Sequence, residues 1–145
     1  MTGIVFDTSI WIAYKPTKLP KNLIMSAVVL QELAAGAADR TILKALEASR
    51  KQYEKEKKLL VPTGEDYFQA GKILNSFLHN LKSESGGRTP RLQPNRIQKL
   101  CRDTLIAVSV GRAQALVVTN NVKDFEAIQR YCRIRVMSGE DYFNR

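Results

Sequence analysis

The sequence predicts an α/β fold in which a mostly parallel central sheet is flanked by helices. Short apolar runs that end in polar residues, such as Ile4–Phe6 and Ala115–Thr119, alternate with longer segments of helical periodicity. Strands separated by helices are typical of βαβ units, which build parallel sheets. The 145 residues, 44% of them hydrophobic, are enough for one core, so we expect a single domain over residues 1–145.

The first elements follow from apolar runs and capping residues. The first strand is followed at once by Asp7-Thr8-Ser9, and a helix is expected to start near Ser9. A second apolar run, Leu23–Met25, predicts the next strand. Ser26 is then a typical N-cap residue, and Gly36 is a typical residue for the end of the helix between them.

Two longer helices are predicted next. Residues 39–59 are rich in Ala, Leu, Lys and Glu, which favour a helix, and residues 60–62 predict a short extended link. Thr63 and Asp66 resemble a capping box at the start of an amphipathic helix that runs to about residue 82.

The C-terminal part contains a loop and four more elements. Residues 83–96 hold glycines, prolines and arginines and predict a long loop. A helix over 95–113, a Val-rich strand over 115–119, a short helix over 124–131 and a last strand over 134–137 follow.

The helix over 95–113 carries apolar residues at helical spacing, which predict one buried face. The members of this face are Ile97, Leu100, Cys101, Leu105, Val108 and, at its end, Arg112. Neither Cys101 nor Cys132 has the spacing of a metal site, so we interpret both as buried small hydrophobic residues.

The net charge of +9 is concentrated in two blocks. Residues 40–58 carry seven basic residues and three acids, and residues 82–102 carry six basic residues and one acid. Such blocks attract polyanions, nucleic acid above all. In the first block the charges interleave, so an ordinary solvated helix face is an equal alternative. In the second block Arg88, Arg91 and Arg96 are the candidates for contact with a polyanion, and a loop without a binding role is the alternative.

Four acids lie where a site is expected to form. Asp7 follows the first strand and Asp124 lies just beyond the strand over 115–119, so parallel strands bring both to one sheet edge. Glu32 and Asp103 lie on predicted helices among mostly apolar neighbours. Acids buried together repel one another unless a cation neutralises them, and carboxylates suit Mg²⁺ or Mn²⁺.

Each acid also has an ordinary structural interpretation. Asp7 or Asp124 would cap the helix that follows, and Asp103 would pair with Lys99 one turn away. For any single acid this interpretation is as good as the metal hypothesis, but it is much weaker for all four together.

Four segments of the chain, in this order, resemble the PIN-domain ribonucleases, most closely the VapC-type toxins of type II toxin–antitoxin systems. They are residues 6–11 (FDTSIW), 26–33 (SAVVLQEL), 102–107 (RDTLIA) and 118–125 (VTNNVKDF). Each segment is weak alone, but the ordered set is specific and spans most of the chain. The resemblance implies a PIN-like three-layer fold.

The resemblance also implies a metal-dependent endoribonuclease that uses Mg²⁺ or Mn²⁺ to hydrolyse RNA phosphodiester bonds. The implied catalytic acids are Asp7, Glu32, Asp103 and Asp124. Of these, Asp7 and Asp103 are expected to bind the ion most directly, and Glu32 and Asp124 to act through water or on a second ion, with Asp124 counted among the metal ligands. For an RNA substrate, Arg88, Arg91 and Arg96 are the candidate RNA-binding residues. The supporting polar residues are Thr8, Ser9, Thr119 and Asn121. Whether one or two ions bind is left open.

A small antitoxin partner and a homodimer are implied as well. No apolar run is long enough for a membrane span and the N-terminus has no signal-like stretch, so we expect a cytoplasmic protein without membrane association. Two alternatives stay open: an RNA-processing PIN nuclease without an antitoxin, and a non-catalytic RNA-binding PIN-like domain. The presence of all four acids argues against the second alternative.

Overall fold

The computed structural model describes residues 2–84, 86 and 93–144. In this part of the chain the strands are β1 (Ile4–Phe6), β2 (Leu23–Ser26), β3 (Leu59–Leu60), β4 (Leu116–Thr119) and β5 (Arg135–Ser138). The helices are α1 (Thr8–Tyr14), α2 (Ala27–Ala35), α3 (Arg40–Lys55), α4 (Gly64–Glu84), α5 (Pro94–Arg112), α6 (Val122–Gln129) and α7 (Gly139–Phe143). None of these helices combines the length and the apolar character that a membrane span needs.

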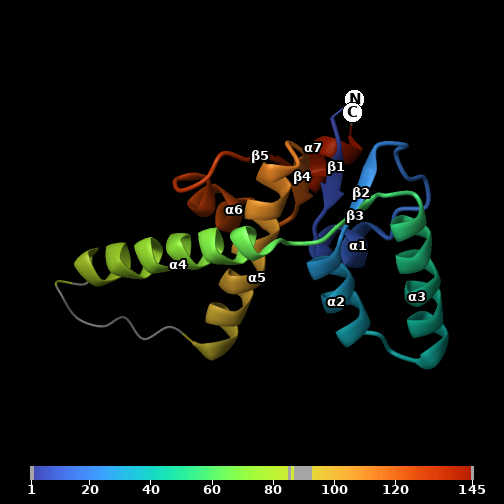
Figure 1. The fold of residues 1–145 in the computed structure, drawn as a ribbon, viewed down its shortest axis with the longest axis horizontal. Coiled ribbons are helices and arrows are strands. Elements are labelled where there is room, and N and C mark those ends of the chain that lie inside the picture. Colours follow the sequence, from blue (N-terminus) through green and yellow to red (C-terminus); the bar gives the residue numbers. More distant parts are fainter. Residues whose placement is uncertain (1, 85, 87–92, 145) are drawn as a thin grey trace.

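The strands form one sheet in the order β3-β2-β1-β4-β5, and each neighbouring pair is parallel. The predicted α/β class with a mostly parallel sheet is therefore confirmed. From β1 the chain first builds the sheet outward through β2 and β3 and then returns to β4 on the other side of β1 (Figure 1). In sheets of this kind, sites form beyond the carboxyl ends of the strands at such a reversal of strand order.

Alternate side chains of the central strands pack on opposite faces of the sheet, because side-chain direction in a strand has a period of two. Val5 and Val117 belong to the larger core cluster, which contains buried residues of α2, α5 and α6. Phe6 and Val118 belong to a second cluster with Ile10 of α1, against which residues of α7 pack. The sheet is thus the middle of three layers, as the PIN-like expectation requires.

The capping residues predicted from the sequence are confirmed. The Ser26 hydroxyl accepts a hydrogen bond from the Val29 N–H at 3.4 Å, and Gly36 is the C-cap residue of α2. Thr63 and Asp66 form a reciprocal capping box. The Asp66 N–H donates to the Thr63 hydroxyl and the Thr63 N–H donates to the Asp66 carboxylate, each at 3.0 Å.

Asp66 also joins α4 to the end of α5. The Nε of Arg112 donates to the two carboxylate oxygens of Asp66 at 3.1 and 2.9 Å, and its Nη2 donates to the Val61 carbonyl at 3.1 Å. We call Thr63, Asp66 and Arg112 the α4–α5 clamp. Arg112 therefore lies in a polar clamp and not on an apolar face as the sequence pattern predicts.

Two short elements differ from the sequence prediction. β3 is a parallel strand beside β2 at residues 59–60, where the pattern predicts the end of a helix and a link. A strand of two residues is too short to show a period in the sequence. α7 is not predicted at all, because its five residues give little more than one helical turn.

The apolar spacing predicts the buried face of α5 only in part: Leu100 and Leu105 pack against the larger core cluster, but two other members of the predicted face do not. Ile97 is 41% exposed and Cys101 is exposed. The buried residues of α5 are instead Asp103, Thr104, Ile106, Ala107, Ser109 and Val110. Thr104 and Ser109 each donate a hydroxyl to a carbonyl oxygen one turn earlier, so both are buried at little cost. Because polar residues occupy some of its buried positions, a hydropathy pattern does not identify the whole buried face of α5.

Candidate active site

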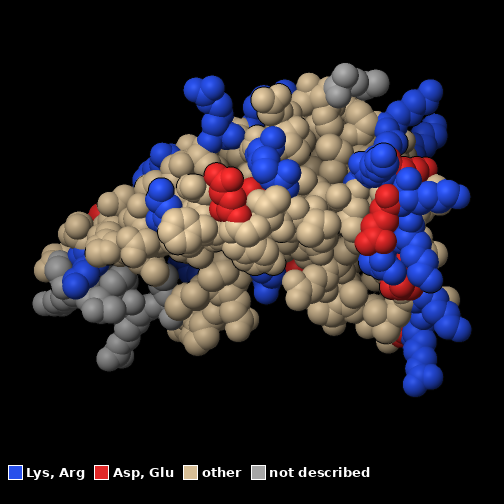
Figure 2. Space-filling model, viewed as in Figure 1, with Lys and Arg blue, Asp and Glu red and all other residues tan. Residues whose placement is uncertain are grey.

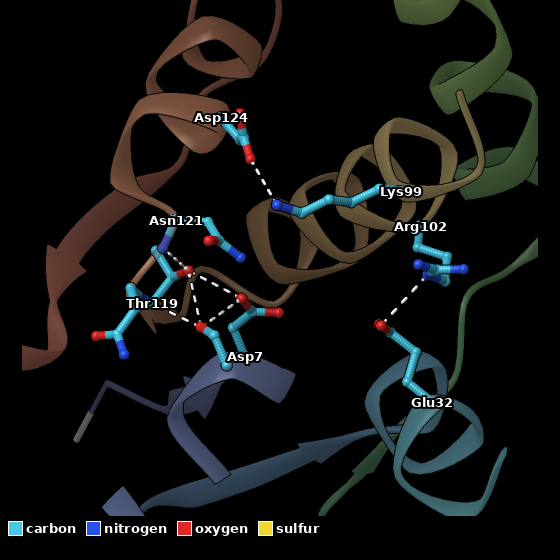
Figure 3. A network of polar contacts seen from close by, with 9 residues as sticks. Asp7, Glu32, Lys99, Arg102, Thr119, Asn121 and Asp124 are labelled. Atoms are coloured by element: carbon cyan, nitrogen blue, oxygen red, sulfur yellow. Dashed lines mark hydrogen bonds and ion pairs between the residues drawn. The ribbon is translucent and has the colours of Figure 1, made fainter. Parts of the chain in front are cut away.

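Asp7 lies at the point where the strand order reverses and is held there by hydroxyl groups. It follows β1 directly and is 2% exposed. Its Oδ2 accepts hydrogen bonds from the hydroxyls of Ser9 at 3.0 Å and Thr119 at 2.8 Å. The Asn121 N–H donates to the same Thr119 oxygen at 2.9 Å (Figure 3). Asp7 occupies the N-cap position of α1 but makes no side-chain capping bond, so the capping interpretation fails for this acid.

Asp103 is the least compensated of the four acids. It is 5% exposed, and its carboxylate has no hydrogen-bond donor among the described residues. Burial raises the pKa of Asp103 to about 7; the charge of Asp7 adds to this, Lys99 opposes it, and Asp124 and Glu32 add smaller contributions. The four acids are therefore close enough to act on one another electrostatically.

Asp124 lies in the first turn of α6 and forms an ion pair with Lys99 of α5. The Lys99 Nζ is 2.9 Å from an Asp124 carboxylate oxygen, and each side chain is somewhat less than half exposed. The hydrogen bond to Asp124 is the main cause that raises the pKa of Lys99, with burial acting against it and Asp103 and Asp7 adding to it. Lys99 thus pairs with Asp124 and not, as the structural interpretation of the sequence had it, with Asp103.

Glu32, in the last turn of α2, pairs with a second basic residue of α5. The Arg102 Nε lies 3.2 Å from the Glu32 Oε2, at ion-pair distance but without hydrogen-bond geometry. Burial raises the pKa of Glu32, against the lowering effect of Arg102. The other Glu32 oxygen, Oε1, and the Thr8 hydroxyl are buried, and neither has a hydrogen-bond partner of good geometry.

The four acids surround one region but are not drawn together. Among the described residues, no three His, Cys, Asp or Glu side chains are close enough to hold a metal ion. Figure 3 shows why: Asp7 turns to Thr119, Asp124 to Lys99 and Glu32 away to Arg102. The donor set nevertheless fits a hard divalent cation, because it consists of carboxylate oxygens, one of them without a partner, around the uncompensated Asp103.

A pocket of about 320 Å³ opens beside Asp103 and Asp124. Three basic residues line it, namely Arg96, Lys99 and Lys123, and its remaining lining is Phe77, Leu100 and Ala127. Arg96 was predicted to contact RNA. Sequence reasoning missed Lys99 and Lys123 as pocket residues, although Lys99 lies one turn before Asp103 and Lys123 adjoins Asp124.

The two basic blocks of the sequence differ in the structure. On α3, Arg50 pairs with Glu47 at 2.6 Å and with Glu54 at 2.8 Å, and Figure 2 shows acidic atoms between the basic ones along this helix. Such internal pairing supports the ordinary helix-face interpretation for the first block. In the second block Arg96 reaches the pocket, whereas Arg88 and Arg91 lie outside the described residues.

No protein-family model and no curated protein sequence matches the chain. Solved structures do match it. A chain of the DNA-bound VapBC from Salmonella typhimurium is 22% identical with a TM-score of 0.57, and the match covers 95% of this chain and 98% of that one. The PIN-like fold is confirmed. VapBC-1 from nontypeable Haemophilus influenzae matches at 21% identity and a TM-score of 0.56, covering 93% of this chain and 96% of that one.

A third PIN-like match is VapBC-5 from Mycobacterium tuberculosis, a member of the VapBC family of toxin–antitoxin systems. It is 20% identical with a TM-score of 0.55, over 95% of this chain and 99% of that one. At these identities the likeness establishes the fold alone. Within this PIN-like fold, the four segments that carry the sequence resemblance lie at the starts of α1, α2 and α6 and in the middle of α5.

Proposed function

We propose that this protein is a metal-dependent endoribonuclease that acts as the toxin of a toxin–antitoxin pair. The observation that carries the proposal is the buried Asp103, whose pKa is raised to about 7 beside three further acids in a PIN-like fold. A carboxylate left without a partner costs stability, and such costs are typical of sites that bind a ligand or do chemistry. A bound cation would remove the cost.

The residues that would hold Mg²⁺ or Mn²⁺ are Asp7, Asp103 and Asp124, with Glu32 acting through water. The ion supplies Lewis-acid chemistry when bound, lowering the pKa of a water molecule and neutralising charge on a phosphate. The Oε1 of Glu32, which has no hydrogen bond of good geometry and only the Thr8 hydroxyl nearby, and the carboxylate of Asp103 have unused acceptor capacity for this purpose.

The other polar residues of the site would prepare the acids and the substrate. Ser9 and Thr119 hold Asp7 through two hydrogen bonds, which fixes one carboxylate before any ligand arrives. Arg96 and Lys123 line the pocket that Asp103 and Asp124 share, so RNA phosphates would meet positive charge next to the acids. Phe77 gives the same pocket an aromatic surface on which an unpaired base can stack.

The toxin role draws on the matched complexes. Three of them are VapBC assemblies, and one is described as a member of a family of toxin–antitoxin systems. We propose that this chain likewise binds a small antitoxin and forms a homodimer. Expression of the chain alone should slow the growth of a host cell, and co-expression with a small neighbouring reading frame should restore it. Unimpaired growth alongside nuclease activity would favour the RNA-processing alternative.

Cleavage of RNA by purified variants tests the nuclease proposal. Asp103→Asn removes the uncompensated charge with little change in shape and should reduce Mn²⁺-dependent cleavage at least about 100-fold, since the loss of even a residue that supports a metal ligand costs about 10–100-fold. Glu126→Gln is the matched control, because Glu126 is exposed on α6 and lies outside the pocket lining.

The control should cleave at the wild-type rate. Equal cleavage by Asp103→Asn and wild type, in Mg²⁺ and in Mn²⁺, would show that the acids are not the catalytic centre. Circular dichroism of both variants checks that the fold is kept.

A further inference from the structure

Two of the four acids already have a positive partner supplied by the chain itself. Lys99 pairs with Asp124 at 2.9 Å and Arg102 pairs with Glu32 at 3.2 Å. Both basic residues lie on α5 ahead of Asp103: Lys99 comes one turn before it and Arg102 directly before it. The helix that carries Asp103 therefore also carries the counterions of Glu32 and Asp124.

The charges of this group suit one divalent ion. Glu32 and Asp124 are paired with Arg102 and Lys99, so Asp7 and Asp103 are the two acids without an ion pair among the described residues. A second divalent ion at Asp124 would have to displace Lys99, and Arg96 and Lys123 add further positive charge to the same pocket.

Lys99 lies next to both acids that a second ion would share. It lies four residues before Asp103, so both side chains leave the same face of α5, and its ammonium group contacts Asp124 of the neighbouring helix α6. Lys99, Asp103 and Asp124 all line the same pocket. An ion shared by Asp103 and Asp124 would compete with this ammonium group for the Asp124 carboxylate.

We propose that Lys99 replaces a second divalent cation at Asp124, so that the site binds one metal ion per chain. The inference rests on the proposed function, because it presupposes that the acids bind a divalent cation. It deepens that function by fixing the number of ions and by giving Lys99 a positioning role: it neutralises Asp124 and holds it toward the pocket that receives RNA.

An ordinary surface ion pair is the simplest competing interpretation. Exposed pairs of Lys and Asp contribute little on their own, and both side chains here are partly exposed. Lys123 allows the two interpretations to be separated. It lines the same pocket and carries the same charge, but the ion pairs among the described residues do not include it.

The test is to count Mn²⁺ ions bound by the full chain, using isothermal titration calorimetry and electron paramagnetic resonance. Wild type should bind one ion per chain. Lys99→Met, which keeps the length of the side chain and removes its charge, should bind a second ion, and the spectrum should show coupling between neighbouring Mn²⁺ ions. Lys99→Arg keeps the charge and should return to one ion.

Two further variants act as controls. Lys123→Met makes the same charge change in the same pocket and should still bind one ion. The double variant Lys99→Met with Asp124→Asn should lose the second ion again, because Asp124 is its proposed ligand. A variant that merely lost fold stability would change neither the number of ions nor their coupling in this pattern, and thermal melts exclude unfolding.

The outcomes separate the inference from the proposed function. Two ions on wild type, or a single ion on Lys99→Met at whatever affinity, would overturn the role of Lys99 while the nuclease proposal stands. A second ion on Lys123→Met would overturn it as well, since a general charge effect would then be enough. No bound Mn²⁺ on wild type, together with no cleavage of RNA, would defeat the proposed function itself.

Discussion

Two buried aspartates of this protein differ in the hydrogen-bond donors around their carboxylates. Asp66 and Asp103 are 3% and 5% exposed, and each lies on a long helix. The Asp66 carboxylate accepts hydrogen bonds from the Thr63 N–H and from Arg112 in the α4–α5 clamp. The Asp103 carboxylate has no donor in the described part of the chain, and its pKa is raised to about 7.

The difference shows how burial alone misleads about function. A buried carboxylate with a full set of donors joins parts of the fold, whereas one without donors costs stability and is available to a ligand. Removing the first should therefore weaken the fold, and removing the second should strengthen the fold and stop the chemistry.

The largest expected effect on stability comes from the clamp. Asp66→Ala removes the capping box and the partner of Arg112, and it should lower the free energy of unfolding by about 2–4 kcal/mol. The value is below that for a fully buried pair because the Arg112 side chain is 43% exposed. Urea denaturation measures it. Glu65→Ala, an exposed acid in the same helical turn, is the control, and an equal loss in the two variants would refute the clamp.

Asp103→Asn should have a smaller effect of the opposite sign, and one that depends on pH. Between about pH 4 and 7 the folded wild type binds more protons than the unfolded chain, because the pKa of Asp103 is about 7 in the folded protein and the ordinary pKa of an aspartate is 3.8. The free energy of unfolding should thus fall as the pH rises through this range. In EDTA the free energy of unfolding of Asp103→Asn should exceed that of wild type by on the order of 2–3 kcal/mol at pH 8. At pH 4 the two proteins should be equally stable.

If the free energy of unfolding changed with pH in the same way for wild type and Asp103→Asn, this interpretation of Asp103 would be contradicted. Mn²⁺ should also stabilise the wild type at pH 8 far more than the variant, since the ion would neutralise the charge that the variant lacks. The difference in melting temperature with and without Mn²⁺ measures this.

The smallest effects concern two arginines. Arg96→Gln should reduce the slope of log affinity for RNA against log salt concentration by about 1, measured in the Asp7→Asn background so that the RNA stays intact. It should change stability by less than about 0.5 kcal/mol. Arg112→Gln makes the same charge change in the clamp, so it should lower stability and leave the slope unchanged. If Arg112→Gln reduced the salt slope and Arg96→Gln left it unchanged, the pocket would not be the place where RNA binds.

The layout of the fold was predictable from the sequence where local signals are strong. Ile4–Phe6 and the Val-rich strand before Asp124 are short apolar runs with polar ends, and Ser26 and Thr63 are residues with a local capping function. β3 and α7 were not predicted because their formation depends on neighbours in the fold and not on their own residues.

The sequence indicated where the acids and Arg96 lie, but not which basic residues pair with the acids. Asp7 could be found because it ends a strand, and Asp103 because Ile106 and Ala107 mark its helical face as buried. The ion pairs of Lys99 and Arg102 join α5 to α6 and to α2, respectively, and no spacing in the sequence encodes the angle between two helices. How the acids are used remains a prediction from sequence, supported by their shared electrostatics.

The hydrogen bond from Thr119 to Asp7 joins residues 112 positions apart, and this has a consequence for synthesis. Ribosomes add about 5–20 residues per second, so roughly 6–20 seconds separate the translation of these two residues. During that time β1 has no β4 beside it, and Asp7 has neither its hydroxyl donor nor the neighbouring acid on α5. A growing chain on the ribosome, surrounded by RNA, therefore cannot assemble its acidic site until most of the protein has been made.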